Sequence, residues 1–236
     1  MPDFRFRSKQ TEMIDTSVPK DLLFQNLREL DFLNRNFGGH SASLEGLKSL
    51  MTDRDRTYHI VDLGCGGGDT LIQIAQWAHK SNLNVKLTGI DKNPDVIDYL
   101  RHRCARYPEI SGIATDYKRF IRFGSTADIM HCSLFCHHLA DEEILELLKY
   151  FKSAARVGFI VNDLVRSRMA YYTVKLFTVL ANGSAIARND GPVSVLRGFN
   201  INELHRFMKS ASIEKYQISR KWAFRFLITG YVGLGN

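Results

Sequence analysis

The chain has 236 residues, of which 44% are hydrophobic and 24% charged. This composition is typical of a globular protein with one well-buried core, and no apolar run reaches the roughly 18 residues that a bilayer-spanning helix needs. The formal net charge of +7 could suit a nucleic-acid binder. However, lysines and arginines are spread along the chain and form no single basic stripe, which argues against a nucleic-acid partner.

The cysteines and the N-terminus indicate a reducing compartment. Four cysteines stand at irregular spacings that match no disulfide framework, at Cys65, Cys104, Cys132 and Cys136. The first 20 residues lack the apolar stretch of a secretory signal. We therefore expect a cytoplasmic protein.

Residues 1–55 are expected to form an N-terminal helical cap. Leucines recur at helical spacing in its first helix, at Leu23, Leu27, Leu30 and Leu33. Gly38 and Gly39 end that helix, and a second, shorter helix is predicted over residues 41–51.

From Tyr58 onward, short apolar runs alternate with amphipathic stretches. Strands are predicted over residues 58–64, 85–91, 109–116, 127–135 and 156–164, and helices over 69–80, 94–107 and 141–155. This alternation is the pattern of a parallel sheet with helices on both faces.

The alternation breaks between about residues 164 and 199, where we expect a helical insertion, and resumes with a helix over 201–211. Two strand-like runs follow, over 213–222 and 224–232, joined too closely for a crossover helix, so they should pair antiparallel. The predicted fold class is α/β: a seven-stranded, mostly parallel sheet with helices on both faces and a C-terminal antiparallel hairpin, plus N-terminal helices and a helical lid insertion.

A glycine-rich turn, VDLGCGGGDT at residues 61–70, follows the first predicted strand. Glycines lack Cβ atoms, so a ligand can lie against the backbone there, in the crevice beyond the carboxyl ends of the strands. The dinucleotide pattern G-x-G-x-x-G fails, because Asp69 stands at its sixth position. The pattern present is Asp62 followed by G-x-G-x-G.

This pattern resembles the first motif of the class I S-adenosylmethionine-dependent methyltransferases, whose sheet also ends in an antiparallel hairpin. The resemblance spans about residues 55–236, makes residues 56–236 a methyltransferase domain, and implies S-adenosylmethionine as the cofactor. It places the methionine end of this methyl donor beside Asp62, Gly64, Cys65, Gly66 and Gly68.

Two further acidic residues stand where the resembled family holds the rest of the donor. Asp91 ends the second strand and can accept hydrogen bonds from both ribose hydroxyls, although a dehydrogenase would also use an acid there. Asp116 would accept from the adenine amino group, with Tyr117 packed on the ring. The donor site is also expected to include Lys92, Cys132 and Ser133.

Two histidines follow the fourth strand, at the position expected to lie beside the donor sulfur. His137 and His138 are the candidates for a general base, which is needed only if the acceptor is protonated; packing is the alternative role. Together with Cys132 and Cys136 they are zinc-ligand types, but no second Cys/His pair accompanies them, so no metal is expected.

The predicted insertion is expected to bind the acceptor, with completion of the core or a homodimer contact as the alternative. Tyrosine can cover an aromatic acceptor and arginine can hold a carboxylate or phenolate, so the candidate residues are Arg166, Tyr171, Tyr172 and Arg197. Asn34, Arg35 and Gly38 could close over the donor or simply end a surface helix.

The predicted activity is methyl transfer to a hydroxyl of a small aromatic or polyketide-like molecule. The segment after the fourth strand, HCSLFCHH, has no proline and so lacks the cluster that grips a nucleic-acid amino group. The phrase LNRNFGGH also resembles a bacterial subgroup of small-molecule methyltransferases. An RNA or protein methyltransferase, favoured by the net charge, and a non-catalytic S-adenosylmethionine-binding protein remain as alternatives.

Overall fold

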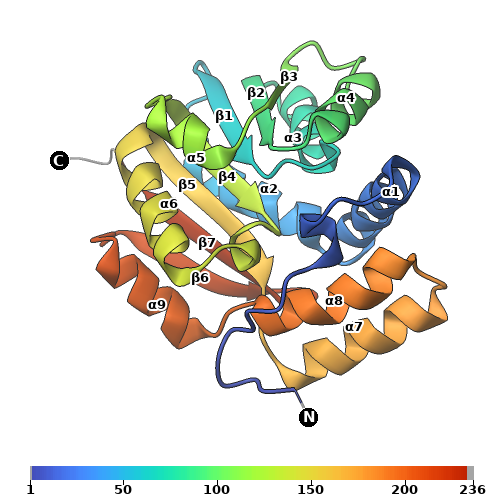
Figure 1. Ribbon diagram of the computed structural model, residues 1–236. Coiled ribbons are helices and arrows are strands. Elements are labelled where there is room, and N and C mark those ends of the chain that lie inside the picture. The colour runs from blue at the N-terminus through green and yellow to red at the C-terminus, as the bar shows by residue number, and fades with distance from the viewer. Residues whose placement is uncertain (1, 233–236) are drawn as a thin grey trace.

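A seven-stranded sheet runs through the middle of the computed structural model, which describes residues 2–232 (Figure 1). The strands are β1 (Thr57–Leu63), β2 (Asn84–Asp91), β3 (Ile110–Ala114), β4 (Ala127–Ser133), β5 (Ala155–Leu164), β6 (Tyr216–Lys221) and β7 (Arg225–Tyr231). Their order across the sheet is β3-β2-β1-β4-β5-β7-β6, and β7 is antiparallel to both of its neighbours. The predicted fold class, including the C-terminal antiparallel hairpin, is confirmed.

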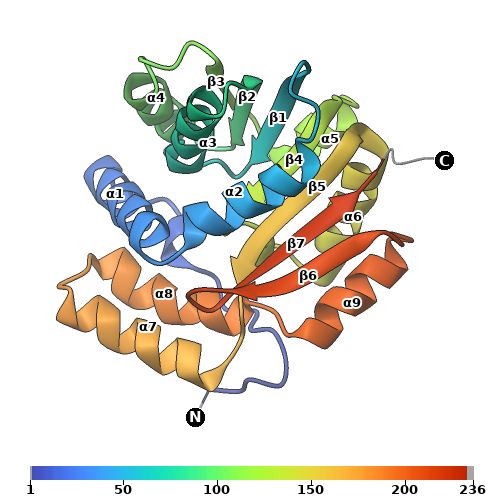
Figure 2. The same cartoon turned by 180° about the vertical axis from the view of Figure 1, so that it is seen from behind.

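Helices cover both faces of this sheet, as Figure 1 and Figure 2 show from opposite sides. One face carries α2 (Gly39–Leu50), α3 (Asp69–Lys80) and α4 (Pro94–Arg103), and the other carries α5 (Tyr117–Arg122), α6 (Asp141–Ala154) and α9 (Ile201–Ser210). Away from both faces lie α1 (Lys20–Asn36), α7 (Arg168–Leu180) and α8 (Ala185–Arg197). Two short 3-10 helices complete the description, η1 (Met13–Asp15) and η2 (Cys136–His138).

The core consists of two apolar layers, one on each side of the sheet. Because successive strand residues point to opposite faces, Ile60 packs under α2 and α3 while Val61 packs under α6. Burying a large apolar side chain of this kind contributes about 1.5–3 kcal/mol. The two layers therefore hold the carboxyl ends of the strands, and the loops that follow them, in fixed positions.

The strand order reverses at β1, which pairs with β2 on one side and β4 on the other. The loops after β1 and β4 therefore lead to opposite faces and leave a crevice between them. The glycine-rich turn leaves β1 at this crevice, and η2 follows β4 there.

The insertion between β5 and α9 is a pair of helices, α7 and α8, that lie side by side (Figure 2). We call this pair the lid. The sequence did not reveal α5, because a helix of six residues is too short to show a periodic apolar face. Asp116 caps it, since its carboxylate Oδ1 accepts a hydrogen bond from the Lys118 N–H at 2.8 Å.

Residues 4–15 form an extended N-terminal segment, which we call the strap, that runs across the lid toward α1 (Figure 1). The Ser8 N–H donates to the Leu196 carbonyl at 3.0 Å. The Met13 and Ile14 N–H groups donate to the two carboxylate oxygens of Asp190 at 2.8 and 2.9 Å. The strap is thus bonded to α8 along its length.

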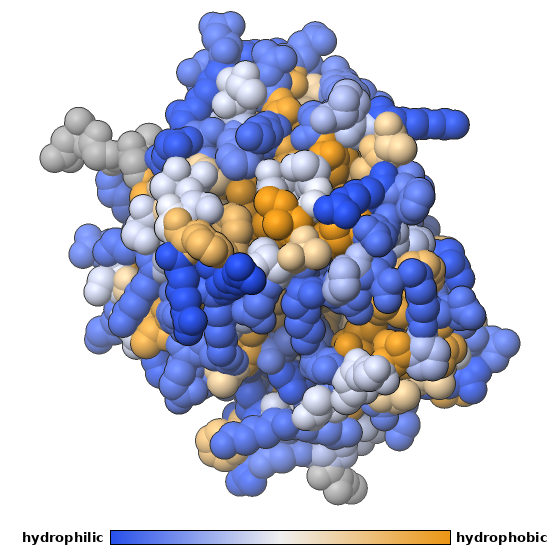
Figure 3. All heavy atoms as spheres, turned by 45° about the horizontal axis from the view of Figure 1, so that its top comes forward, coloured by the Kyte–Doolittle hydropathy of each residue, from blue (hydrophilic) through white to orange (hydrophobic). Residues whose placement is uncertain are grey.

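No helix within residues 2–232 has the length and apolar character needed to cross a membrane. The surface seen in Figure 3 is mostly hydrophilic, with apolar side chains gathered near its middle.

Candidate active site

A cavity of about 640 Å³ lies at the carboxyl edge of the sheet and is closed by α1, the lid and the strap. One half is lined by the loops that follow β1, β2, β3 and β4. The other half is lined by side chains of α1, α7 and α8 and by the loop before β7. A ligand bound at the strand ends and a second ligand under the lid would therefore share one cavity.

The glycine turn forms one wall of the first half, with Gly64 and Gly66 lining it. Gly64 has φ +70°, and a Cβ built on it would lie 2.3 Å from Cδ2 of Phe135. Its N–H donates to the Ile90 carbonyl at 2.9 Å. This position therefore requires glycine both for its backbone conformation and for the close approach of Phe135.

Four of the residues that the sequence predicts to bind the donor also line this half: Asp91, Lys92, Asp116 and Tyr117. Asp91 accepts a hydrogen bond from the Asn93 N–H at 2.9 Å, and burial raises the pKa of its carboxyl. Tyr117 packs edge-on against Phe135, with 5.4 Å between the ring centroids. Asp91 and Asp116 thus place two carboxylates on the cavity, while the Tyr117 and Phe135 rings provide an apolar surface.

Five residues predicted for the donor site do not line the cavity: Asp62, Cys65, Gly68, Cys132 and Ser133. Asp62 is buried, and its carboxylate lies 2.7 Å from Nδ1 of His131. Cys132 is also buried, with its sulfur 3.5 Å from that of Cys136. Burial raises the pKa of the Cys132 thiol well above its ordinary value. Direct contact of these five side chains with a donor stays a prediction.

His137 lines the cavity where its two halves meet and forms a pair with Asp163. Its Nδ1 lies 2.7 Å from Oδ1 of Asp163, and its backbone N–H donates to Oδ2 at 3.2 Å. Burial alone would raise the pKa of the Asp163 carboxyl, but the nearby imidazole holds that pKa below its ordinary value. Asp163 therefore stays ionised at neutral pH and orients the His137 ring.

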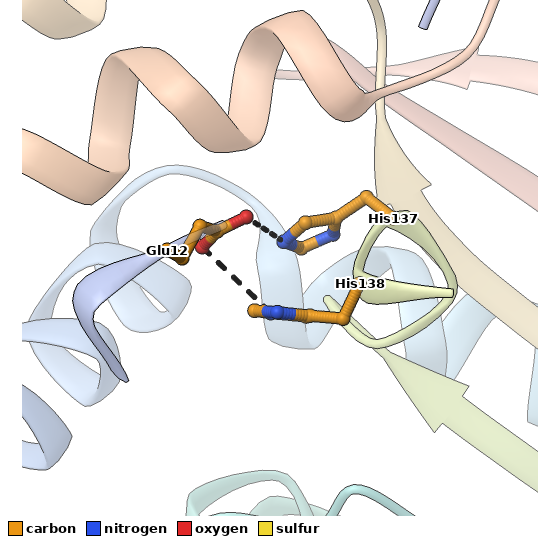
Figure 4. Close-up of side chains that lie close together, drawn as sticks. All are labelled: Glu12, His137 and His138. Atoms are coloured by element: carbon orange, nitrogen blue, oxygen red, sulfur yellow. Dashed lines mark ion pairs between the residues drawn. The ribbon is translucent and has the colours of Figure 1, made fainter. Parts of the chain in front are cut away.

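His138 lies beside His137, with 4.2 Å between the ring centroids, and its Nδ1 is 3.1 Å from Oδ2 of Asp15. Glu12 of the strap lies close to both rings, at 3.7 Å from Nε2 of His137 and 3.9 Å from Nε2 of His138 (Figure 4). Burial raises the pKa of the Glu12 carboxyl to about 6. No local pattern in the sequence points to Glu12, because it stands 125 positions before His137.

The four residues predicted to bind the acceptor do not line the cavity: Arg166, Tyr171, Tyr172 and Arg197. Arg166 is buried and donates to the carbonyls of Phe4 and Gly198 and, at 2.6 Å, to the carboxylate of Glu203. Arg197 donates to the carbonyls of His137 and His138 at 2.9 and 2.6 Å. Both arginines satisfy backbone carbonyls, and Arg197 ties the lid to the strap by donating to the Gln10 carbonyl at 2.6 Å.

The lid contributes a different set of side chains to the cavity: Thr173, Val174, Phe177 and Thr178 from α7, and Ala187, Asp190, Gly191, Ser194 and Val195 from α8. The α7 residues recur every three or four positions, so helical periodicity could have identified this face. The tyrosines instead lie elsewhere on α7, and Tyr171 packs against Phe4 at 5.7 Å.

Arg225, at the start of β7, is a buried cation that the sequence did not single out. It lines the cavity with 4% of its surface exposed, and burial lowers its pKa to about 10. Its Nη2 donates to Oδ1 of Asn34 at 2.8 Å and its Nη1 to Oδ1 of Asn162 at 3.5 Å. Within residues 2–232, no carboxylate lies within ion-pair distance of Arg225.

Asn34 also donates to Asp69 at 2.9 Å, so it links Arg225 to the N-terminus of α3. Arg35 and Gly38, which the sequence suggests alongside Asn34 as a cover over the donor, have different surroundings. Arg35 is paired with Asp31 on the surface, and Gly38 has φ +77° before α2.

Comparisons with known proteins agree with this architecture. Residues 60–158 match the family model described as a methyltransferase domain. A search of curated proteins gave no sequence match. The match covers less than half of the chain, and the solved structures that resemble the chain show that it has the class I, Rossmann-like methyltransferase fold.

Three solved structures illustrate the likeness. Human N-acetylserotonin methyltransferase in complex with SAM aligns over 91% of this chain and 57% of its own, with a TM-score of 0.66 and 16% identity. The plantazolicin methyltransferase in complex with SAH aligns over 90% and 95%, with a TM-score of 0.63 and 16% identity. A SAM-dependent methyltransferase from Aquifex aeolicus aligns over 92% and 100%, with a TM-score of 0.62 and 13% identity. The chain thus spans less than two thirds of the human enzyme and nearly all of the other two.

Proposed function

We propose that this protein transfers a methyl group from S-adenosylmethionine to a hydroxyl of a small aromatic or polyketide-like molecule. The observation that carries the proposal is the single cavity, with the glycine turn and Asp91 at one end, an apolar lid at the other, and His137 between them. The solved methyltransferases with bound SAM or SAH support the choice of donor.

The residues of the first half, together with Arg225 at the start of β7, fit such a donor. Asp91 can accept from the ribose hydroxyls, and Asp116 with Tyr117 can contact the adenine. The glycine turn leaves the backbone open to the methionine end. Arg225 is a buried guanidinium without a carboxylate partner in the described chain, and a buried charge is stable only when paired. The donor's free carboxylate would pair with it.

S-adenosylmethionine supplies an electrophilic methyl group on a sulfonium. The cavity contributes mainly by placing the acceptor oxygen in line with that group and by excluding water. His137 Nε2 would take the proton from the acceptor hydroxyl as the new oxygen–carbon bond forms. Asp163 holds the Nδ1 side of the ring and stabilises the imidazolium that results.

Isothermal titration of the intact protein with S-adenosylhomocysteine tests the donor assignment. We expect binding that falls at least tenfold in Asp91→Ala, because charge-assisted hydrogen bonds contribute about 1.5–3 kcal/mol. Asp98→Ala, on the exposed surface of α4, is the matched control. Absence of binding by the intact protein would overturn the proposal.

A panel of hydroxylated aromatic acceptors tests the reaction. Turnover should be lost in His137→Ala and kept in His102→Ala, which removes an exposed histidine. Donor binding with no product across the panel would favour a binding protein. Salt-dependent RNA binding with RNA methylation would favour the nucleic-acid alternative.

A further inference from the structure

Glu12, His137 and His138 gather three potential metal ligands at one point of the cavity wall (Figure 4). The carboxylate of Glu12 and one nitrogen of each imidazole all lie within 4.8 Å of one another. Glu12 and His137 are buried and His138 is partly buried, so these groups are held by the fold and are not loose surface side chains.

Each imidazole is oriented by a second carboxylate. Asp163 binds Nδ1 of His137 at 2.7 Å, and Asp15 binds Nδ1 of His138 at 3.1 Å. Both Nε2 atoms are thereby directed toward Glu12. A carboxylate on the far nitrogen of each ligand histidine is the usual outer shell of protein metal sites, where it fixes the tautomer and raises ligand basicity.

Glu12 has an unused acceptor at this point. Its Oε2 accepts from the Ser194 hydroxyl at 2.7 Å, but its buried Oε1 accepts no hydrogen bond. Arg197 Nε lies 3.5 Å from Oε1 but donates to the His137 carbonyl instead. A buried carboxylate oxygen without a donor is costly, and a cation would satisfy it.

We propose that Glu12, His137 and His138 bind a divalent transition-metal ion of the zinc class. Two imidazole nitrogens and one carboxylate oxygen are a ligand set that suits zinc, with about 2.0–2.2 Å from the metal to each ligand. Oε1 of Glu12 lies 3.7 Å from Nε2 of His137, a few tenths of an ångström longer than a tetrahedral site needs, roughly 3.4 Å. The other carboxylate oxygen, Oε2, lies 3.9 Å from Nε2 of His138. All three residues line the cavity, so the fourth position faces the space for the acceptor.

Metal binding has a consequence that rests on the proposed function. His137 Nε2 cannot hold a metal and accept a proton at the same time. The metal-bound protein would thus bind the donor normally but would not methylate a protonated hydroxyl.

The test uses the intact protein, stripped with a chelator and titrated with Zn²⁺ in a non-coordinating buffer. We expect one ion per chain, with affinity reduced at least 100-fold in Glu12→Gln and in His138→Ala. Co²⁺ should give the visible absorption of a four-coordinate ion, and the same two variants should lose it. S-adenosylhomocysteine affinity reports whether each variant is folded.

His40→Ala is the matched control, because His40 belongs to a second group of potential ligands, with Asp31 and Asp69, away from the strap. The proposal is overturned if the intact protein binds no Zn²⁺, if Glu12→Gln binds Zn²⁺ as tightly as the intact protein, or if His40→Ala loses the binding. Zinc binding is measured without any acceptor, so a failure to find methyl transfer leaves this result intact. Zinc that binds without reducing turnover would overturn the inhibitory consequence alone.

Discussion

Replacing Arg225 by methionine should make the protein more stable and a weaker donor binder. The guanidinium is 4% exposed, and burial lowers its pKa from 12.5 to about 10. That difference corresponds to about 3 kcal/mol of unfavourable free energy for keeping the charge in the fold at neutral pH. Loss of the hydrogen bond leaves Oδ1 of Asn34 without its donor, which costs about 1 kcal/mol or more. We therefore expect Arg225→Met to raise the free energy of unfolding by up to about 2 kcal/mol.

The same substitution removes the proposed partner of the donor's carboxylate. A charge-assisted hydrogen bond contributes about 1.5–3 kcal/mol, so S-adenosylhomocysteine should bind about 10- to 150-fold more weakly. 5′-Methylthioadenosine has no carboxylate, and its affinity should change less than about threefold.

Calorimetry with both ligands, together with urea unfolding, measures these effects. Arg220→Met is the matched control, because Arg220 is exposed on β6 and contacts only the Phe226 ring among the described aromatic side chains. Equal losses for both ligands would show that Arg225 acts through the general shape of the site. An unchanged affinity for S-adenosylhomocysteine, or a less stable variant, would refute the reasoning.

Three further predictions concern the site and its walls. Asp163→Asn should lower kcat about 100-fold or more while donor affinity changes little, because a neutral amide no longer stabilises the His137 imidazolium; unchanged kcat would remove His137 as the base. Gly64→Ala should lower the melting temperature more than Gly124→Ala, since both glycines have positive φ but only at Gly64 would the added Cβ meet a close neighbour, Cδ2 of Phe135 at 2.3 Å. Calorimetry of both variants separates the cost of this clash from the cost of the backbone conformation. The folded-state pKa of Glu12 is raised from 4.5 to about 6, so its contribution to stability falls by about 2 kcal/mol as pH rises through that window. Glu12→Gln should lack this change in urea unfolding with a chelator present, and identical pH profiles for the two proteins would contradict it.

The donor half of the site could be predicted because one continuous stretch of chain builds it. Strand ends and turns are visible as local patterns, and parallel strands bring their carboxyl ends to one edge. Gly64, Asp91 and Asp116 are therefore on the cavity wall, as expected from the sequence. Asp62 is one of the five predicted residues that do not line the cavity, and it lies behind the wall against His131.

The acceptor half could not be predicted in the same way, because the type of a side chain does not determine which group it hydrogen-bonds to in the fold. Arg166 and Arg197 were expected to hold an acidic acceptor, but both meet backbone carbonyls that the strap and η2 leave unsatisfied. A buried carbonyl without a donor costs free energy, so a guanidinium with five N–H groups is well suited to that position. Nothing local in the sequence records that the strap passes beside these arginines.

The different origins of the two halves explain why the donor is easier to infer than the acceptor. Residues 64–118 supply most of the donor half. The acceptor half combines α1, the lid, the strap and the loop before β7, segments that are distant in sequence and can each vary without disturbing the sheet. Glu12 illustrates the effect: its place beside His137 depends on Asp190 binding the Met13 and Ile14 N–H groups, and hence on where α8 lies. A change in α8 or in the strap would thus alter the groups that face the acceptor, and leave the glycine turn and Asp91 where they are.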